Sequence, residues 1–260
     1  MNGFPTFVAA VRQAALGACE NLVVVRRVGS TNAVARRMAQ AILEEDSDLG
    51  RTLVLAWEQS RGRGRRGNAW ASPAGQGIYA TLLEPLGTDR PLEPLPLAVA
   101  VGLADGVDRL LGAGVCRLKW PNDLLVEGRK LGGILIEVVE ANEGRAAVIG
   151  FGINHAAPAE QPPAPNATTL GAWGSSVPDL AAVAARLVST VIEELDAARS
   201  MAETVERYQQ RSSLRPGSTL RCRVGEEPVE GTFLGFDPRG YLRLATPSGE
   251  RILSAGEILE

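Results

Sequence analysis

The sequence has few residues of the types that ligate metals or form disulfides. It contains one histidine, His155, and three cysteines, Cys19, Cys116 and Cys222, with no CxxC pair. This excludes a disulfide framework and a zinc site built from neighbouring residues. A Ser-His-Asp triad would depend on His155 alone. Such cysteine usage is typical of a reducing compartment, so we expect a cytoplasmic location.

Long apolar runs and a strong net charge are also missing. The most apolar segment, 95–111, contains three charged residues, so no stretch reaches the ~18 apolar residues of a membrane span. The N-terminal apolar segment is interrupted by Arg12 and preceded by no basic residue, which favours an amphipathic helix over a signal peptide. The net charge of −3 disfavours binding of nucleic acid over the whole surface. Any anion site must therefore be local.

The composition is that of a globular protein with a large core, because 45% of the 260 residues are apolar and 22% are charged. Helix and strand patterns follow one another without strict βαβ order, which predicts an α+β fold with a mixed or largely antiparallel sheet. Helices are expected at 7–19, 32–45, 95–111, 180–196 and 202–210, and strands at 22–25, 52–57, 78–83, 115–119, 124–126, 131–139 and 146–153.

The pattern changes at Arg215-Pro216-Gly217. From there on, short β runs at 219–224, 229–236, 241–244 and 251–253 are separated by turn residues. This predicts a small barrel-like module. We therefore divide the chain into a catalytic domain, 1–212, and a C-terminal module, 213–260.

A long loop at 58–77, between two predicted strands, contains the sequence RGRGRRG at 61–67. Glycines let backbone N–H groups approach an anion, and arginines donate bidentate hydrogen bonds to phosphate or carboxylate. The pattern favours an anion-binding loop. Four clustered arginines repel one another, so we expect the loop to be mobile when empty and ordered when occupied.

Other interpretations of this loop differ in the structure they need. Gly62, Gly64 and Gly67 have the spacing of a dinucleotide fingerprint, but the residues after Gly67 cannot start the required helix. No P-loop sequence occurs in the chain. A solvated basic turn and an RNA-binding segment stay open as alternatives.

A second motif, Lys119-Trp120-Pro121-Asn122-Asp123, is followed by Lys130 at the start of a glycine-containing strand. A turn at 127–129 would make a hairpin in which Asp123 and Lys130 lie across from each other. Such a pair beside two glycines can hold a small anionic molecule against the backbone. The alternative is one exposed ion pair with Trp120 in the core.

The strand at 146–153 has glycines on one face. Gly150 and Gly152 alternate, so that face is bare and something can lie on it, with Asn154 at the strand's end. The same glycines could instead allow close packing of the sheet.

Read in order, these motifs closely resemble those of the biotin protein ligases. They are Ser30-Thr31-Asn32, Gln59 with the loop 61–67 and Trp70, the segment 119–123, the strand start 130–135 and the strand end 150–154. The resemblance covers nearly the whole chain. It implies a catalytic domain of the class II aminoacyl-tRNA synthetase and biotin ligase type, followed by a small SH3-like β-barrel.

The resemblance implies a two-step reaction. The carboxylate of biotin attacks the α-phosphorus of ATP, with Mg²⁺ assisting, to give biotinyl-5′-AMP and pyrophosphate. A lysine of a biotin carboxyl carrier protein, from acetyl-CoA carboxylase or a related enzyme, then attacks the mixed anhydride. Clustered cations and a closed loop suit this chemistry, because they stabilise anions and keep water from the anhydride.

The resemblance also implies residue roles. The catalytic residues would be Lys130, Arg65 and Asp123, with Asp123 orienting Lys130, binding Mg²⁺ or accepting the lysine proton. Biotin would contact Ser30, Thr31, Asn32, Gln59, Gly62, Arg63, Lys130 and Gly133. The nucleotide would contact Arg63, Arg65, Arg66, Trp70, Asn122, Lys130, Gly152, Asn154 and Arg207.

The sequence departs from the family pattern in a few places. Asn68 and Ala69 replace basic residues often found after the loop, which leaves retention of the adenylate in question. Only 29 residues precede Ser30, fewer than a ~60-residue DNA-binding module needs, so we expect no DNA binding. A homodimer formed through the central sheet stays open. The rival functions are a lipoate or octanoyl ligase and a non-catalytic module that sequesters RNA or biotin.

Overall fold

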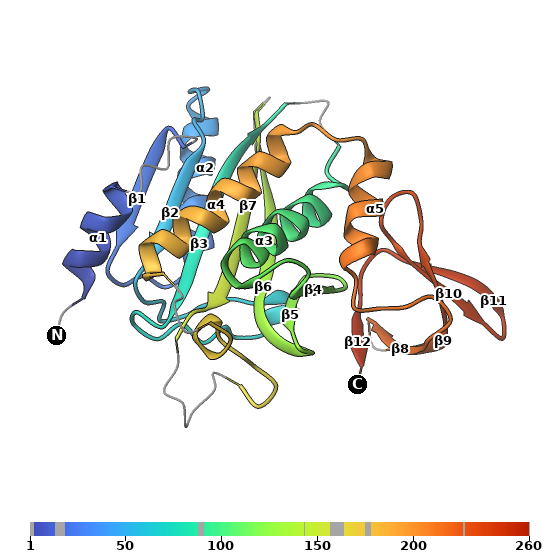
Figure 1. Cartoon of the computed structure of the whole chain (residues 1–260). Coiled ribbons are helices and arrows are strands. Elements are labelled where there is room, and N and C mark those ends of the chain that lie inside the picture. The colour runs from blue at the N-terminus through green and yellow to red at the C-terminus, as the bar shows by residue number, and fades with distance from the viewer. Residues whose placement is uncertain are drawn as a thin grey trace.

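The computed structural model describes residues 3–13, 19–87, 91–142, 144–156, 164–174, 178–225 and 227–259. A seven-stranded sheet has the order β1-β2-β3-β7-β6-β5-β4, in which only β1 and β2 are parallel neighbours (Figure 1). Its strands are β1 (Asn21–Val25), β2 (Thr52–Ala56), β3 (Gly77–Leu86), β4 (Cys116–Lys119), β5 (Asp123–Val126), β6 (Arg129–Ala141) and β7 (Gly144–Asn154). The predicted α+β fold with a mixed sheet is confirmed.

Helices cover both faces of this sheet (Figure 1). On one face lie α3 (Leu95–Leu111) and α4 (Leu180–Asp196), and on the other lies α2 (Thr31–Glu44). At the ends of the unit lie α1 (Phe4–Gln13), which packs against α4, and α5 (Met201–Arg211), which packs against α3. The helix predicted at 7–19 starts earlier, at Phe4, and residues 14–18 lie outside the described part of the chain.

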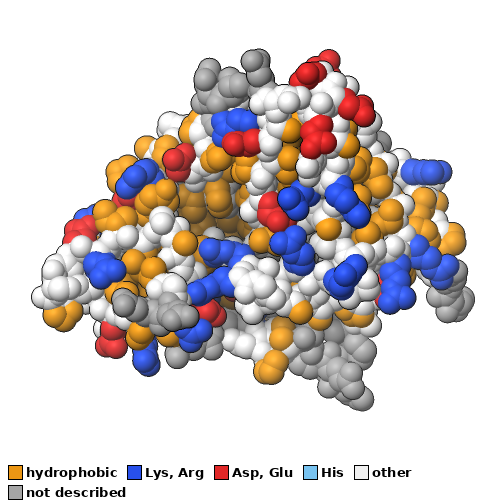
Figure 2. All heavy atoms as spheres, turned by 180° about the vertical axis from the view of Figure 1, so that it is seen from behind, with side chains coloured by type: hydrophobic (Ala, Val, Ile, Leu, Met, Phe, Trp, Pro, Cys, Tyr) orange, Lys and Arg blue, Asp and Glu red, His pale blue; other side chains and the backbone are white. Residues whose placement is uncertain are grey.

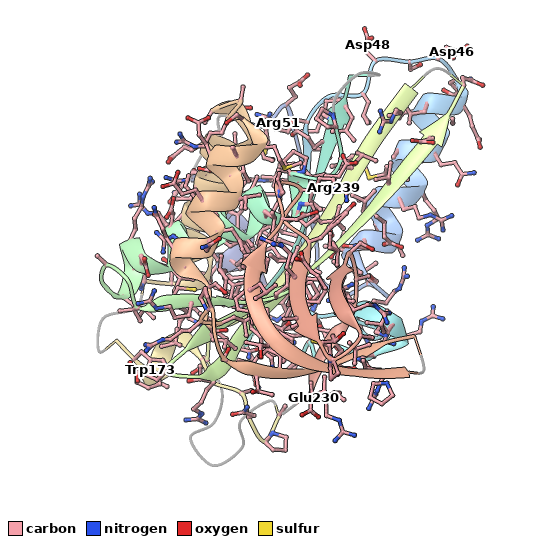
Figure 3. The ribbon with its side chains drawn as sticks, turned by 90° about the vertical axis from the view of Figure 1, so that its right-hand side faces the viewer. Asp46, Asp48, Arg51, Trp173, Glu230 and Arg239 are labelled. Atoms are coloured by element: carbon pink, nitrogen blue, oxygen red, sulfur yellow. The ribbon has the colours of Figure 1, made fainter. Side chains whose placement is uncertain are left out.

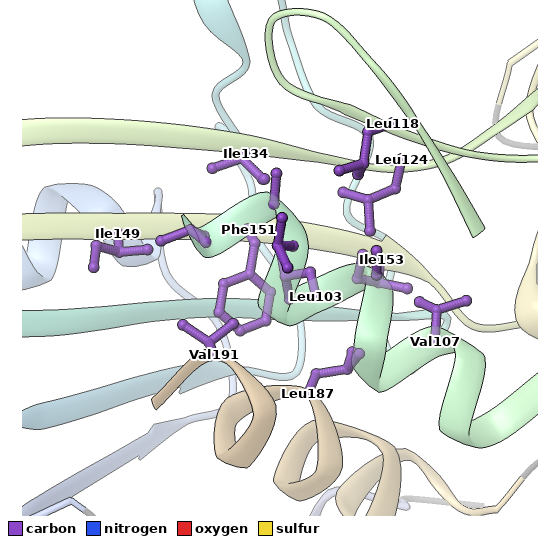
Figure 4. Close-up of a cluster of buried hydrophobic side chains, with 14 of the residues drawn as sticks. Leu103, Val107, Leu118, Leu124, Ile134, Ile149, Phe151, Ile153, Leu187 and Val191 are labelled. Atoms are coloured by element: carbon purple, nitrogen blue, oxygen red, sulfur yellow. The ribbon is translucent and has the colours of Figure 1, made fainter. Parts of the chain in front are cut away.

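The main core lies between the sheet and the pair α3 and α4. Ile149, Phe151 and Ile153 of β7 point toward these helices (Figure 4). Gly102 of α3 lets α4 approach closely, since a Cβ there would lie 2.8 Å from the backbone of Val191. Because side chains alternate along a strand, the even-numbered residues of β7 face the opposite side. That side carries the site described below.

The C-terminal module is a five-stranded antiparallel sheet in the order β11-β10-β9-β8-β12. Its strands are β8 (Thr219–Val224), β9 (Glu227–Phe236), β10 (Leu242–Thr246), β11 (Gly249–Leu253) and β12 (Glu257–Leu259). Figure 3 views the molecule from the side of this module. The predicted β module is confirmed, although β12 was not anticipated. Its edge strands β11 and β12 do not pair with each other in the described residues, so barrel closure stays a prediction.

The module follows α5 directly. At the junction, Ser213 N–H donates a hydrogen bond to Leu118 O at 2.8 Å, which ties the start of the module to β4. The domain boundary at 212 stays a prediction. Within the described part of the chain, no helix combines the length and apolar character needed to span a bilayer.

Candidate active site

A pocket opens on the α2 side of the large sheet, where the start of α2, the glycine-arginine loop 61–67, β6, β7 and β12 meet. Lys and Arg side chains gather around the middle of this face (Figure 2). The pocket is lined by these residues predicted from the sequence: Ser30, Thr31, Asn32, Gln59, Arg63, Arg65, Arg66, Trp70, Asn122, Asp123, Lys130, Gly133 and Gly152. The structure therefore brings most of the predicted set together.

The start of α2 is fixed by a side chain from another segment. Ser30 occupies the N-cap position, but its hydroxyl makes no capping bond. Instead, the amide oxygen of Gln59 accepts hydrogen bonds from the Thr31 N–H at 2.8 Å and the Thr31 hydroxyl at 3.2 Å. Gln59 Nε2 in turn donates to Ser72 Oγ at 2.9 Å. The Ser30 hydroxyl is left to line the pocket.

Asn32 is occupied by protein partners. Its Nδ2 donates to Leu135 O and to Glu137 Oε2, both at 3.1 Å, and its Oδ1 accepts from the Thr81 hydroxyl at 2.7 Å. A Cβ at Gly150 would collide with this amide. Asn32 is only 4% exposed, so the geometry supports a role in holding the pocket wall more than direct contact with a ligand.

Trp70 covers Gly152 of β7. A Cβ at Gly152 would collide with the indole ring, and the indole Nε1 is buried without a hydrogen-bond partner. The sequence suggested that this face of the strand is bare and could hold a ligand. In the structure, Asn32 and Trp70 fill part of it. Gly133 is different, because the nearest atoms to a Cβ there lie at 3.6 Å or more.

Lys130 and Asp123 form the predicted pair. Lys130 Nζ lies 2.6 Å from Asp123 Oδ1, and the two side chains are 38% and 22% exposed. The hairpin is confirmed, but a register shift after Leu124 pairs Lys130 with Leu125 and Asp123 with Gly133. The Lys130 Nζ also lies 5.7 Å from the centroid of the Trp70 ring, a weak cation–π contact.

Both backbone groups of Lys130 are hydrogen-bonded to the segment 166–168. Its N–H donates to Asn166 O at 2.8 Å, and its carbonyl accepts from Thr168 N–H at 2.8 Å and from Asn154 Nδ2 at 3.5 Å. Asn154 does not line the pocket. Its side chain contacts the backbone of Lys130 instead. A contact between Asn154 and the nucleotide stays a prediction.

Three arginines of the loop contact three different elements. Arg63 Nη2 lies 3.2 Å from Glu137 on β6, and Arg65 Nη1 donates to Asn122 Oδ1 at 3.2 Å. Arg66 lies 3.4 Å from Glu257 on β12 and donates to Gly225 O at 3.0 Å. These carboxylate, amide and carbonyl oxygens of the protein offset the mutual repulsion of the three guanidinium groups. Mobility of the empty loop stays a prediction.

The surroundings of Arg65 disfavour its positive charge. Burial lowers the pKa of the Arg65 guanidinium, and the nearby Arg66 lowers it further, while Asp123 acts in the opposite direction. The attraction of an anion placed beside Arg65 would oppose both of these contributions. The guanidinium stays protonated in water because its ordinary pKa is so high.

Gly62 and Arg207 lie outside the pocket lining. A Cβ at Gly62 would collide with the Trp70 carbonyl, so this glycine is needed for close backbone packing inside the loop. Arg207 contacts Asp105 at 2.9 Å and Glu194 at 3.2 Å, joining α5 to α3 and α4. The structure does not bring Arg207 to the other candidate residues.

Some residues at the site were missed from the sequence. Glu137 shares the pocket face of β6 with Gly133, and this spacing of four on a strand could have identified it. Glu257 and Ile258 line the pocket from β12, which no local pattern linked to the other motifs.

The described residues do not build a protein metal centre. They contain no group of three or more His, Cys, Asp or Glu side chains that could hold an ion. Asp123 is held by Lys130, and Glu257 is shared by Arg66 and Arg223. A magnesium ion would depend on nucleotide phosphates for most of its ligands, and Asp123 as a ligand stays a prediction.

Comparison with known proteins gives a consistent relationship. Residues 24–154 match the biotin/lipoate A/B protein ligase family, and residues 220–259 match the biotin protein ligase C-terminal domain. The chain is 32% identical over 247 residues to the biotin--[acetyl-CoA-carboxylase] ligase of Paracoccus denitrificans, covering 90% of this chain and 98% of the relative. It is 31% identical over 246 residues to the ligase of the same name from Mycobacterium tuberculosis, covering 92% and 88%.

The fold agrees with this relationship. The structure is similar to that of the biotin protein ligase from Aquifex aeolicus in complex with biotin and ATP, with a TM-score of 0.73 and 26% identity over 92% of this chain and 98% of the other. The chain therefore belongs to the biotin protein ligases, within the biotin/lipoate A/B protein ligase family.

Proposed function

We propose that this chain activates biotin with ATP as biotinyl-5′-AMP and transfers the biotinyl group to a lysine of a biotin carboxyl carrier protein. The observation that carries the proposal is one pocket that holds Lys130, Arg63 and Arg65 beside the polar start of α2. The relatives of this chain are named as ligases for acetyl-CoA carboxylase. The carrier of that carboxylase is therefore the first protein substrate to test.

In the first step, an oxygen of the biotin carboxylate bonds to the α-phosphorus of ATP, and pyrophosphate leaves with the electrons of the broken P–O bond. Both reactants are anions, so they repel each other unless cations lie between them. Lys130 and Arg65 both line the pocket and supply this charge. Asp123, at 2.6 Å, holds the Lys130 ammonium in place.

In the second step, the amine of the carrier lysine attacks the acyl carbon and AMP leaves. Negative charge develops on the carbonyl oxygen, and the Lys130 ammonium lies where it could stabilise that charge. The amine must lose a proton as the amide forms. Asp123 is the nearest lining carboxylate to Lys130 and is our candidate acceptor.

The polar ring of biotin needs both donors and acceptors. The Ser30 hydroxyl lines the pocket without a capping bond, and the Gln59 amide nitrogen keeps one N–H beyond its bond to Ser72. We assign the ring to this end and the nucleotide to the end formed by Trp70, Asn122 and Arg65. Gly133, where a Cβ would make only ordinary contacts at 3.6 Å or more, would lie beside the tail.

A second copy of the chain is proposed to pair with the open edge of β6. The pairing of β6 with β5 stops at Gly133, opposite Asp123. The next residue, Ile134, is hydrogen-bonded to Asn122 through both its N–H and its carbonyl, each at 3.0 Å. Alternate residues direct their backbone groups to the same side, so Ile136 and Val138 present theirs to an edge with no strand partner in the described residues. The three free cysteines fit a cytoplasmic location for the assembly.

The test is incubation of the purified chain with biotin, ATP, Mg²⁺ and a carrier domain. The proposal predicts pyrophosphate release that depends on biotin and a carrier that gains one biotinyl group. Lipoate in place of biotin is expected to give neither. Turnover with lipoate but not biotin, or tight RNA binding without turnover, would contradict the proposal.

A further inference from the structure

Glu137 has a fixed position at the edge of the pocket, although it does not line the pocket itself. One carboxylate oxygen lies 3.2 Å from Arg63 Nη2, and the other accepts a hydrogen bond from Asn32 Nδ2 at 3.1 Å. Glu137 is 24% exposed at its side chain, against 50% for Arg63. The carboxylate therefore lies between the buried amide of Asn32 and the more exposed guanidinium of Arg63.

Asn32 itself has little freedom. Its amide also donates to Leu135 O and accepts from the Thr81 hydroxyl, and it packs where Gly150 has no side chain. Its hydrogen bond to Glu137 consequently fixes one oxygen of the carboxylate from the protein interior. The second oxygen is then directed at Arg63 with little loss of side-chain entropy on pairing.

The backbone around Arg63 does little to fix the position of its side chain. Arg63 stands between Gly62 and Gly64, which restrict the backbone least of all residues. Its backbone makes one isolated β-bridge, to Ala69, and Glu137 is the side chain found paired with its guanidinium. A guanidinium has five N–H donors, so it can keep Glu137 on one edge and offer another edge to the pocket.

We propose that Glu137 is a positioning residue that holds Arg63 toward the phosphate of the acyl-adenylate. The inference rests on the proposed function and adds a residue to it. Asn32, Glu137 and Arg63 form a chain from the buried start of α2 to the ligand. We expect longer retention of the adenylate until the carrier arrives, because pairing with Glu137 reduces the ordering that Arg63 must undergo when the ligand binds.

Whether Glu137→Gln weakens or tightens binding of the adenylate distinguishes a positioning role from a change in net charge alone. Removing a carboxylate from the edge of an anion site makes the site more positive, which by itself would tighten binding of the adenylate. Loss of positioning would weaken binding instead. Glu137→Gln removes the charge but leaves an oxygen for Asn32, so the variant tests Arg63 while the pocket wall is retained.

The experiment measures release of the adenylate. The chain forms labelled adenylate from biotin and ATP without carrier, and excess unlabelled biotin then reveals the rate of release. We expect Glu137→Gln to release it about 10-fold faster, the lower end of the range for a hydrogen bond to a charged group, because Arg63 is half exposed. Glu137→Asp keeps the charge but shortens the side chain, and it too should release faster.

Two further variants make the test specific. In an Arg63→Gln background, Glu137→Gln should add less than about a twofold change, because both substitutions remove the same contact. Glu140→Gln on the same strand loses an equal charge and a similar ion pair, with Arg145, and should release at the normal rate. Melting temperatures verify that all variants are folded.

The results that overturn the proposal are distinct from failure of the proposed function. Unchanged or slower release by Glu137→Gln would refute positioning, as would the same acceleration in the Arg63→Gln background. If the unaltered chain forms no adenylate at all, the proposed function itself is wrong, and the role of Glu137 falls with it.

Discussion

Among single residues, Lys130 is the one on which the proposed chemistry depends most. Its ammonium lies in the pocket and is oriented by Asp123, and its backbone is hydrogen-bonded to the segment 166–168. We predict that Lys130→Ala slows adenylate formation about 10²- to 10³-fold, the usual cost of removing one group that stabilises developing charge. The Lys130 side chain is 38% exposed, so the melting temperature should hardly change. Pyrophosphate release in a single turnover measures the effect, and an unchanged rate would exclude this role.

Two glycines give a matched pair of substitutions. Gly150→Ala would push into the Asn32 amide, so we expect the free energy of unfolding to fall by about 1–3 kcal/mol from overpacking. Gly133→Ala meets nothing closer than 3.6 Å and should leave unfolding unchanged. If Gly133 lies under the biotin tail, its variant should still raise the KM for biotin. Denaturant unfolding and steady-state kinetics separate the two effects, and a normal KM for Gly133→Ala would place biotin elsewhere.

At the scale of elements, Arg207 distinguishes a stabilising contact from a functional one. It joins α5 to α3 and α4 through Asp105 and Glu194, and Glu194 is only 5% exposed at its side chain. We expect Arg207→Ala to lower the free energy of unfolding by about 1–2 kcal/mol, because the buried carboxylate loses a partner and keeps Arg199. The KM for ATP should not change. A raised KM with normal stability would instead support the nucleotide contact that the sequence suggested.

The elements also explain which parts of the fold the sequence predicts. The ends of α3 coincide with proline at its start and Gly112 at its end, and both α3 and α4 have the predicted bounds. β12 has three residues and makes its pairing with β8, far away in the chain, so its short pattern carried no signal. Local signals predict long elements well, and long-range pairing decides short ones.

The candidate site follows the same division. Lys130, Asp123 and the loop arginines were predicted because their motifs are compact in sequence. The space above Gly150 and Gly152 could not be assigned, since Asn32 and Trp70 reach it from distant segments. A bare strand face indicates that something lies on it, but the sequence does not say whether that is a ligand or another side chain of the protein.

At the scale of the whole molecule, the open edge of β6 predicts association. Two chains related by a twofold axis could pair these edges antiparallel, with Val138, now 38% exposed, near the contact. We expect sedimentation equilibrium to detect a dimer whose dissociation constant rises at least about tenfold in Val138→Lys, since like charges would then face each other across the axis. A dimer unaffected by this substitution would place the interface elsewhere.

The central claim is that Lys130, Arg63 and Arg65 enclose the phosphate of an acyl-adenylate between β6 and the glycine-arginine loop. A crystal structure of the chain grown with biotin and ATP tests it most directly. We expect this structure to show the polar ring of biotin beside Ser30 and Gln59, and the phosphate within hydrogen-bond distance of Lys130 and Arg65. Nucleotide bound outside this pocket, with residues 61–67 turned away from it, would contradict the account.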